Sequence, residues 1–174
     1  MPDGPAETLS PAVPTAVEEA AEKLLRQCCD AQLTIATAES CTGGLLASLL
    51  TDIPGASHAF ERGVVVYSEG SKCELLGVAR DQIDTCGAVS REVAIAMAQG
   101  AINQSTADIA LAITGYAGPT DDGGEDGLVH LACARRDGAT FHTVEHFGAI
   151  GRGPVRIGAI ASALKLMEEA IDGA

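Results

Sequence analysis

The sequence predicts an α/β fold, a three-layer α/β/α sandwich with a mixed β-sheet. Segments typical of strands alternate with segments of helical periodicity, a pattern that favours parallel strands joined by helices. Near the C-terminus, two strand-like segments flank Asp137-Gly138, a dipeptide that favours a hairpin and therefore adds antiparallel strands. We expect one domain over residues 15–174, preceded by a mobile tail at residues 1–14 that holds four of the seven prolines.

Each predicted element has a local signal. The helical segments, which have an apolar face or a Ser or Thr start signal, begin at Thr15, Leu45, Ser68, Ser90 and Arg152. The strand-like segments cover residues 33–37, 58–67, 108–114, 128–135 and 140–147. Thr15 and Glu18 predict a capping box at the first helix. Residues 108–114 are continuously apolar in their middle, which indicates a central strand covered on both faces.

Composition excludes several kinds of partner. The net charge is −13 with only eleven Lys and Arg residues, so the chain lacks the basic surface that nucleic acids or anionic membranes require. No apolar run reaches the length of a membrane span, and the N-terminus has no secretory signal pattern. We therefore expect a cytoplasmic protein with a small-molecule ligand, no nucleic acid and no membrane partner. The Ala- and Gly-rich helices can pack closely against a copy, so a homo-oligomer of unspecified size is also expected.

The cysteines and histidines predict neither a metal site nor a cofactor. The six cysteines include no CxxC pair, and we expect reduced, mostly buried thiols. His142 and His146 are four residues apart, but their segment alternates like a strand, so helical ligand geometry does not apply. Cys41 is the exception to consider, because a thiol at a helix N-terminus can have a lowered pKa and act as a nucleophile.

The stretch AESCTGG, residues 38–44, has the pattern of a strand, a tight turn and a helix start. A hydroxyl at such a junction lies where the free N–H groups of a helix converge, and these donors favour negative charge in a substrate or an oxyanion. Ser40 is therefore the first candidate nucleophile. The alternative is that Ser40 only N-caps the helix, a common role for serine.

Two other predicted strands end in polar groups. Tyr67 ends the second strand, and Lys72 lies about one helical turn later. The strand at residues 108–114 leads into a glycine-rich loop, residues 115–127, that is too long and too polar for a simple hairpin. Because ligands in α/β folds gather at the carboxyl ends of strands, we expect these groups to converge with Ser40.

Four segments, TAESCTGGLLASLLTDIPGAS, RGVVVYSEGSKCELLGV, GAVSREVAIAMAQGA and ITGYAGP, together resemble the CinA C-terminal domain family. The resemblance runs in the same order from roughly Ala16 to Glu168, and the family contains the nicotinamide mononucleotide deamidases. It implies an α/β/α domain that hydrolyses the carboxamide of nicotinamide mononucleotide to nicotinate mononucleotide and ammonia without a metal, in pyridine nucleotide recycling. Ser40 matches the serine of the ESCTGG motif, and Tyr67 and Lys72 match its Y-x4-K stretch, which implies a Ser-Tyr-Lys catalytic site.

Amide hydrolysis by these residues sets physical requirements. Lys72 could accept the Ser40 proton only as a neutral amine, so its pKa must fall from about 10.4 toward neutrality. Tyr67 could relay protons or hold Lys72 in place. The backbone N–H groups of Thr42 and Gly43 are candidate oxyanion donors, since glycines allow close approach.

For the phosphate of a mononucleotide, an acidic protein must concentrate donors locally. The arginines at the start of the last helix and the amides of the glycine-rich loop are the candidates for that role. The full set of candidate substrate-binding residues is Thr42, Gly43, Gly44, Thr114, Gly115, Gly118, Arg152 and Arg156. The alternative for the two arginines is an ordinary exposed position on the surface.

The chain departs from the family pattern after Gly118-Pro119, where family members have a Lys-Pro-Val-Gly-like segment and this chain has TDDGGEDGLVH. The acidic residues in this loop are Asp121, Asp122, Glu125 and Asp126. The loop motivates an alternative to the enzyme, a module that binds a pyridine nucleotide without turning it over. A third hypothesis is an interaction domain that accompanies DNA uptake or repair, although the missing basic surface argues against direct DNA contact.

Overall fold

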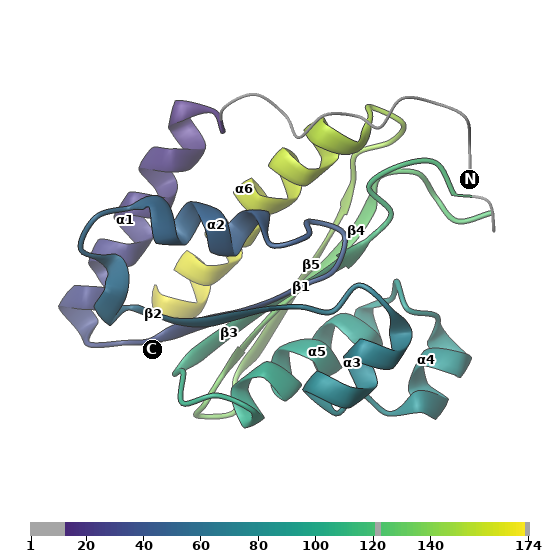
Figure 1. Ribbon diagram of the computed structural model, residues 1–174, viewed down its shortest axis with the longest axis horizontal. Coiled ribbons are helices and arrows are strands. Elements are labelled where there is room, and N and C mark those ends of the chain that lie inside the picture. Colours follow the sequence, from purple (N-terminus) through teal and green to yellow (C-terminus); the bar gives the residue numbers. More distant parts are fainter. Residues whose placement is uncertain (1–12, 121–122, 173–174) are drawn as a thin grey trace.

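A five-stranded mixed sheet lies between two layers of helices in the computed structural model, which describes residues 13–120 and 123–172 (Figure 1). The helices are α1 (Thr15–Ala31), α2 (Leu45–Asp52), α3 (Glu69–Leu76), α4 (Arg80–Cys86), α5 (Arg91–Asn103) and α6 (Arg152–Asp172), with a 3-10 helix, η1 (Ala56–His58). The strands are β1 (Ile35–Glu39), β2 (Phe60–Val65), β3 (Ile109–Gly115), β4 (Leu128–Arg135) and β5 (Thr140–His146). The predicted α/β/α sandwich is confirmed. Most of the predicted tail lies outside the described residues, but Val13 packs against the core.

The strand order is β2-β1-β3-β4-β5. Strand β1 pairs in parallel with both β2 and β3, and β3, β4 and β5 pair in antiparallel fashion. The predicted hairpin joins β4 to β5, with Gly138 at a φ of 102°. Because β1, β2 and β3 run the same way, the residues that follow them meet at one edge of the sheet, and β1 lies in the middle of the three.

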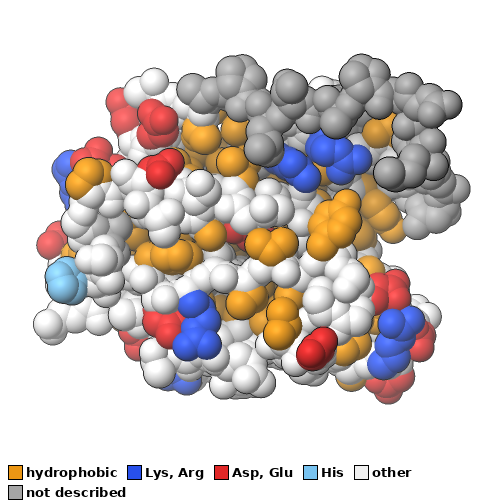
Figure 2. Space-filling view, in the orientation of Figure 1, with side chains coloured by type: hydrophobic (Ala, Val, Ile, Leu, Met, Phe, Trp, Pro, Cys, Tyr) orange, Lys and Arg blue, Asp and Glu red, His pale blue; other side chains and the backbone are white. Residues whose placement is uncertain are grey.

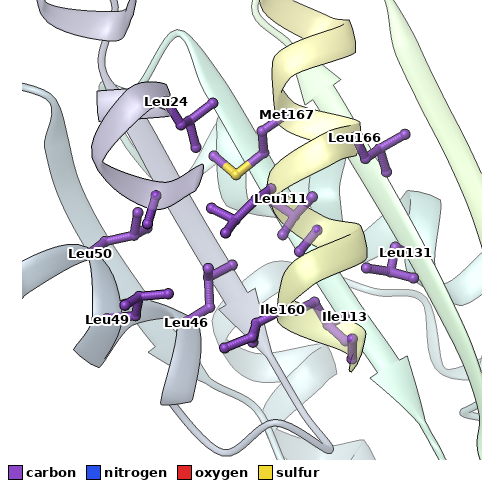
Figure 3. Packing of buried hydrophobic residues seen from close by; sticks show 14 of the residues in the cluster. Leu24, Leu46, Leu49, Leu50, Leu111, Ile113, Leu131, Ile160, Leu166 and Met167 are labelled. Carbon is purple, nitrogen blue, oxygen red and sulfur yellow. The ribbon is translucent and has the colours of Figure 1, made fainter. Parts of the chain in front are cut away.

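Side chains alternate between the two helical layers along each strand. Ile35 of β1 faces the layer of α1, α2 and α6, while Ala36 and Ala38 face the layer of α3, α4 and α5. Figure 3 shows the first of these cores, where leucines from α1 and α2 meet Leu111 of β3 and Met167 of α6. The opposite core is built largely from alanines, which lets α5 lie close to the sheet. No helix in the described part of the chain is both long and apolar enough to cross a membrane.

Most helix starts follow the sequence signals. Ser68 forms a capping box with Ser71 at α3, and Ser90 accepts a hydrogen bond from the Val93 N–H group at α5. The predicted capping box at Thr15 is wrong, because the N-cap of α1 is Pro14, which has no side-chain cap. Helix α4 was not predicted, since this short, polar segment buries only Ile83.

Candidate active site

Ser40 lies directly after β1, in the turn of residues 40–44, which we call the Ser40 turn. Its N–H group donates to the Ile113 carbonyl oxygen at 3.0 Å, so the sheet holds its backbone in place, and the residue is 7% exposed. Helix α2 begins only at Leu45, and its N-cap is Gly44, with a φ of 93°. The alternative in which Ser40 N-caps this helix is therefore wrong.

The first amides of α2 are occupied by Glu39, a residue that the sequence analysis did not single out. Its carboxylate accepts hydrogen bonds from the N–H groups of Gly44 (3.2 Å), Leu46 (3.1 Å) and Ala47 (2.8 Å), and the residue is 1% exposed. The sequence signal that could have identified Glu39 is its position as an acidic residue just before a predicted helix start. The Gly43 N–H group donates to the Ser40 carbonyl oxygen at 3.1 Å, so the prediction that it serves as an oxyanion donor is not supported.

Lys72 reaches Ser40 from α3. Its Nζ donates to Ser40 Oγ at 3.1 Å and to the Val66 carbonyl oxygen at 2.9 Å, and the residue is only 2% exposed. Burial lowers the pKa of the Lys72 amine, an effect that Cys41, Glu69 and Cys73 oppose. Glu69 is bound instead to Arg80 at 2.9 Å, and no ion pair joins Lys72 to a carboxylate among the described residues.

Cys41 does not have the environment of a reactive thiol. Burial raises its pKa to about 11, although Arg156 opposes the shift. The structure thus gives no support to the alternative of a Cys41 nucleophile. All six cysteines are free, and three are buried while Cys29 and Cys86 are exposed, so the expectation of mostly buried thiols is only half right.

Ser40 and Lys72 open onto a cleft of about 280 Å³ at the carboxyl edge of the parallel strands. The residues that line this cleft are Ser40, Cys41, Tyr67, Lys72, Ala88, Val89, Thr114, Gly115, Tyr116, Ala117, Gly118, Pro119 and Arg152. The predicted convergence of the three strand ends is therefore present. The lining among the described residues contains no Asp or Glu, although the chain carries twenty-four of them.

The two predicted arginines have different positions. Arg152 lines the cleft and packs against Gly118, where an added Cβ would lie 2.6 Å from Arg152 Nη2. Arg156 does not line the cleft, and its Nε donates to the Cys41 carbonyl oxygen at 2.8 Å. Arg156 thus holds the Ser40 turn. The hydroxyl of Thr114 also makes a structural contact, because its Oγ1 donates to the Ala88 carbonyl oxygen at 2.8 Å.

Tyr67 lines the cleft but is 67% exposed, and its hydroxyl makes no hydrogen bond to another described residue. In this structure, no hydrogen bond joins the Tyr67 hydroxyl to Lys72 or Ser40, so the predicted proton relay has no direct contact to support it. Lys72 binds the carbonyl oxygen of Val66, the residue directly before Tyr67. Lys72 therefore fixes the backbone next to Tyr67, while the tyrosine ring projects from it.

The two described carboxylates of the acidic loop have partners outside the cleft lining. Asp126 accepts from the Thr120 N–H group at 3.1 Å, and Glu125 lies 2.8 Å from Nδ1 of His146. Neither carboxylate lines the cleft. Asp121 and Asp122, which carry the rest of the predicted departure from the family, lie outside the described residues.

His142 and His146 lie on β5, as the alternation of their segment predicted, and His130 lies on β4, whereas His58 ends η1. His142 Nε2 of β5 lies 3.2 Å from Nδ1 of His130 on β4, and the two rings stack. Among the described residues, no group of three or more His, Cys, Asp or Glu side chains could hold a metal ion.

The fold and the cleft together define an α/β/α domain with a serine and a buried lysine at the carboxyl edge of its parallel strands. The chain belongs to the CinA C-terminal domain family, whose sequence model matches residues 17–171. The family resemblance inferred from the four motifs is thereby confirmed.

Relatives and solved structures agree with this assignment. A putative competence-damage inducible protein of Desulforamulus reducens is 44% identical over 83% of this chain and 35% of its own length. A CinA-like protein of Chlorobium phaeobacteroides is 53% identical over 64% of this chain and 27% of its own length. The chain thus spans about a quarter to a third of these curated relatives.

Two solved structures match nearly end to end. The competence/damage inducible protein CihA from Agrobacterium tumefaciens is 40% identical with a TM-score of 0.87, covering 94% of this chain and 99% of that one. A competence-damaged protein (CinA) superfamily protein from Escherichia coli is 33% identical with a TM-score of 0.84, covering 94% and 95%.

Proposed function

We propose that this chain is a nicotinamide mononucleotide amidohydrolase, which releases ammonia and nicotinate mononucleotide in pyridine nucleotide recycling. The observation that carries the proposal is the buried Lys72 amine, 3.1 Å from Ser40 Oγ and without a carboxylate partner among the described residues. A buried lysine that is not neutralised by an acid is costly as an ammonium ion, and burial accordingly favours the neutral amine that a general base requires.

In the acylation step, the Lys72 amine accepts the proton of Ser40 while Oγ attacks the carboxamide carbon. The lysine then gives this proton to the amide nitrogen, which leaves as ammonia, and the nicotinoyl group remains as an ester on Ser40. In the second step, Lys72 accepts one proton from water while the water oxygen attacks the ester carbon, and Lys72 then gives this proton to Ser40 Oγ as the ester bond breaks. The other water proton remains on the new carboxyl group and passes to solvent when that group ionises to give nicotinate mononucleotide. The contact with the Val66 carbonyl oxygen keeps the amine aimed at Ser40 throughout.

The oxyanion of each tetrahedral intermediate needs hydrogen-bond donors. We assign this role to the N–H groups of Cys41 and Thr42, because neither donates to a backbone carbonyl among the described residues. Gly43 and Gly44 contribute their conformation instead, with φ angles of 65° and 93° that let the Ser40 turn close tightly.

For the phosphate, Arg152 is the proposed charged donor, since it is the arginine that lines the cleft. The backbone of Gly115 and Gly118 lines the same space, and Gly118 leaves room for the guanidinium group. The absence of carboxylates from the described lining supports an anionic ligand in an otherwise acidic protein.

The test is ammonia release from nicotinamide mononucleotide, run beside nicotinamide riboside, nicotinamide and glutamine. We expect release from the mononucleotide above all, and a loss of at least about a thousandfold in Ser40→Ala. Ser40→Ala should stay folded, because Ser40 caps no helix. In Ser40→Cys, an acyl-enzyme seen by intact mass would support covalent chemistry. Binding of the mononucleotide by wild-type protein without ammonia release would favour the pyridine-nucleotide-binding module.

We also propose that the protein is cytoplasmic, acts on a small molecule and assembles with copies of itself. The oligomer is proposed from the Ala- and Gly-rich composition of the helices, since many of their alanines are already buried in the protomer's own cores. Light scattering of the purified protein tests the oligomer, and a monomer at micromolar concentration would contradict it.

A further inference from the structure

The two tyrosines of this chain, which has no tryptophan, both line the Ser40 cleft. Tyr67 follows β2 and Tyr116 follows β3, and these strands flank β1, which leads to Ser40. Aromatic side chains are rare in this chain, at 3% of residues, so two in one cleft form a local concentration of flat apolar surface on both sides of the nucleophile.

The two rings differ in how they are held. The backbone of Gly124 packs on Tyr116, since a Cβ added there would lie 2.7 Å from the ring carbon Cε2. No described glycine packs on Tyr67 in this way, and the residue is 67% exposed. Its backbone is nevertheless fixed, because the preceding residue, Val66, donates its N–H to the Glu39 carbonyl oxygen at 2.8 Å and accepts from Lys72.

An exposed tyrosine on a fixed backbone fits neither a packing role nor the predicted proton relay. A packing residue would be buried, and a relay would need a hydrogen bond from the hydroxyl to Ser40 or Lys72. Val65, two residues before Tyr67, is 50% exposed. Figure 2 shows that hydrophobic side chains are exposed across the middle of one face of the molecule. The ring face of Tyr67 is thus available to a ligand in the cleft.

The charge of the cleft makes such a ring useful. A nicotinamide nucleotide carries a positive charge on its pyridinium ring, but the described lining offers no carboxylate to stabilise that charge and includes the cationic Arg152. The face of an aromatic ring attracts a cation through its quadrupole and stacks on a flat heterocycle. Tyr67 can therefore stabilise the pyridinium ring without adding a negative charge that would oppose the phosphate.

We propose that Tyr67 is a specificity-determining residue whose ring stacks on the pyridinium ring and selects the oxidised, cationic nucleotide over its neutral dihydropyridine form. This inference rests on the proposed function. The hydroxyl of Tyr67 is not needed for it, so the role differs from the proton relay implied by the family motif.

The experiment measures equilibrium binding of oxidised and reduced nicotinamide mononucleotide to the Ser40→Ala protein, which avoids turnover. Tyr67→Leu should weaken binding of the oxidised form by about fivefold to thirtyfold and that of the reduced form much less. Tyr67→Phe, which keeps the ring, should bind both forms like the parent. Leu75→Ala, which removes another exposed apolar side chain outside the cleft, is the matched control and should change neither.

Kinetics in the wild-type background give a second readout. Tyr67→Leu should raise KM for the mononucleotide with kcat nearly kept, whereas loss of a relay would lower kcat in both Tyr67→Phe and Tyr67→Leu. Either of two results would overturn the inference: equal weakening of both ring forms in Tyr67→Leu, or a Tyr67→Phe protein as impaired as Tyr67→Leu. If the wild-type protein still released ammonia, the proposed function would stand. A wild-type protein that releases no ammonia, with a Ser40→Ala protein that binds neither form, would overturn both.

Discussion

Glu39 and Lys72 are both buried, ionisable and close to Ser40, but their surroundings are opposite. Glu39 points into the layer of α2, where three backbone N–H groups bind its carboxylate at 2.8–3.2 Å. Lys72 comes from α3 on the other face of the sheet, where Nζ contacts a hydroxyl and a carbonyl oxygen and no carboxylate among the described residues. The period-two alternation of β1 places neighbouring residues 39 and 40 toward these two different layers.

The different surroundings of the two residues give Glu39 a role in stability and Lys72 a role in the chemistry at Ser40. Three backbone N–H groups bind the Glu39 carboxylate and fix the start of α2, which is a structural task. The Lys72 amine has neutral partners only, so burial lowers its pKa and costs stability when the group is charged. We therefore expect substitutions on the Glu39 side of the Ser40 turn to affect mainly folding, and those on the Lys72 side to affect mainly turnover.

The largest expected effect is that of Lys72→Met on turnover. Methionine has a similar length and keeps the packing while it removes the amine, so ammonia release should fall by at least about a thousandfold. Lys165→Met, at an exposed position on α6, is the control and should be fully active. Turnover within about tenfold of wild type would remove Lys72 from the mechanism.

The same variant should not lose stability. With its pKa lowered from 10.5, folded Lys72 binds its proton less readily than the unfolded chain, so wild-type stability rises with pH between the lowered value and 10.5. At pH values below that window, the lowered pKa of Lys72 reduces the wild-type free energy of unfolding by its full amount. Urea titration at pH 7 should therefore find Lys72→Met at least as stable as wild type, with an advantage that shrinks toward pH 10.5.

The next effect in size is that of Glu39→Gln on folding. The amide keeps one acceptor oxygen but replaces the other with a donor and removes the charge at the helix start, so the free energy of unfolding should fall by about 1–3 kcal/mol. Turnover of the folded protein should fall by less than tenfold. Glu22→Gln, on the surface of α1, should change neither quantity. A Glu39→Gln protein that is as stable as wild type but inactive would reverse the assignment of the two residues.

The smallest effect should come from Arg156→Met. Its loss frees the Cys41 carbonyl oxygen from a 2.8 Å hydrogen bond, which should lower kcat severalfold as the Ser40 turn loosens, with KM unchanged. Arg152→Met, in contrast, should raise KM for the mononucleotide by about tenfold and leave kcat nearly unchanged. An Arg156→Met protein with a raised KM and normal kcat would restore the phosphate-binding role predicted for it.

The sequence predicted what depends on local pattern. The strands, the helix starts at Ser68 and Ser90, and the meeting of three strand ends follow from periodicity, capping and the topology of α/β sheets. It did not predict contacts made by side chains across a turn or across the chain. Glu39 reaches five to eight residues ahead, and Arg156 reaches Cys41 from 115 residues away. Such partners leave no periodic signal, and for that reason the sequence allowed a helix cap at Ser40 as the alternative and included Arg156 beside Arg152 among the phosphate candidates.

The central claim is that the fold holds Lys72 as a readily deprotonated base beside Ser40. The chain has only three lysines, and Lys23 and Lys165 provide internal references in the same sample. We would titrate the ¹³C-labelled lysine side chains by NMR and assign the Lys72 signal by its absence from Lys72→Met. The account predicts a Lys72 signal whose pKa is lowered from the ordinary 10.5. A Lys72 signal that titrates at 10.5 or above would contradict it.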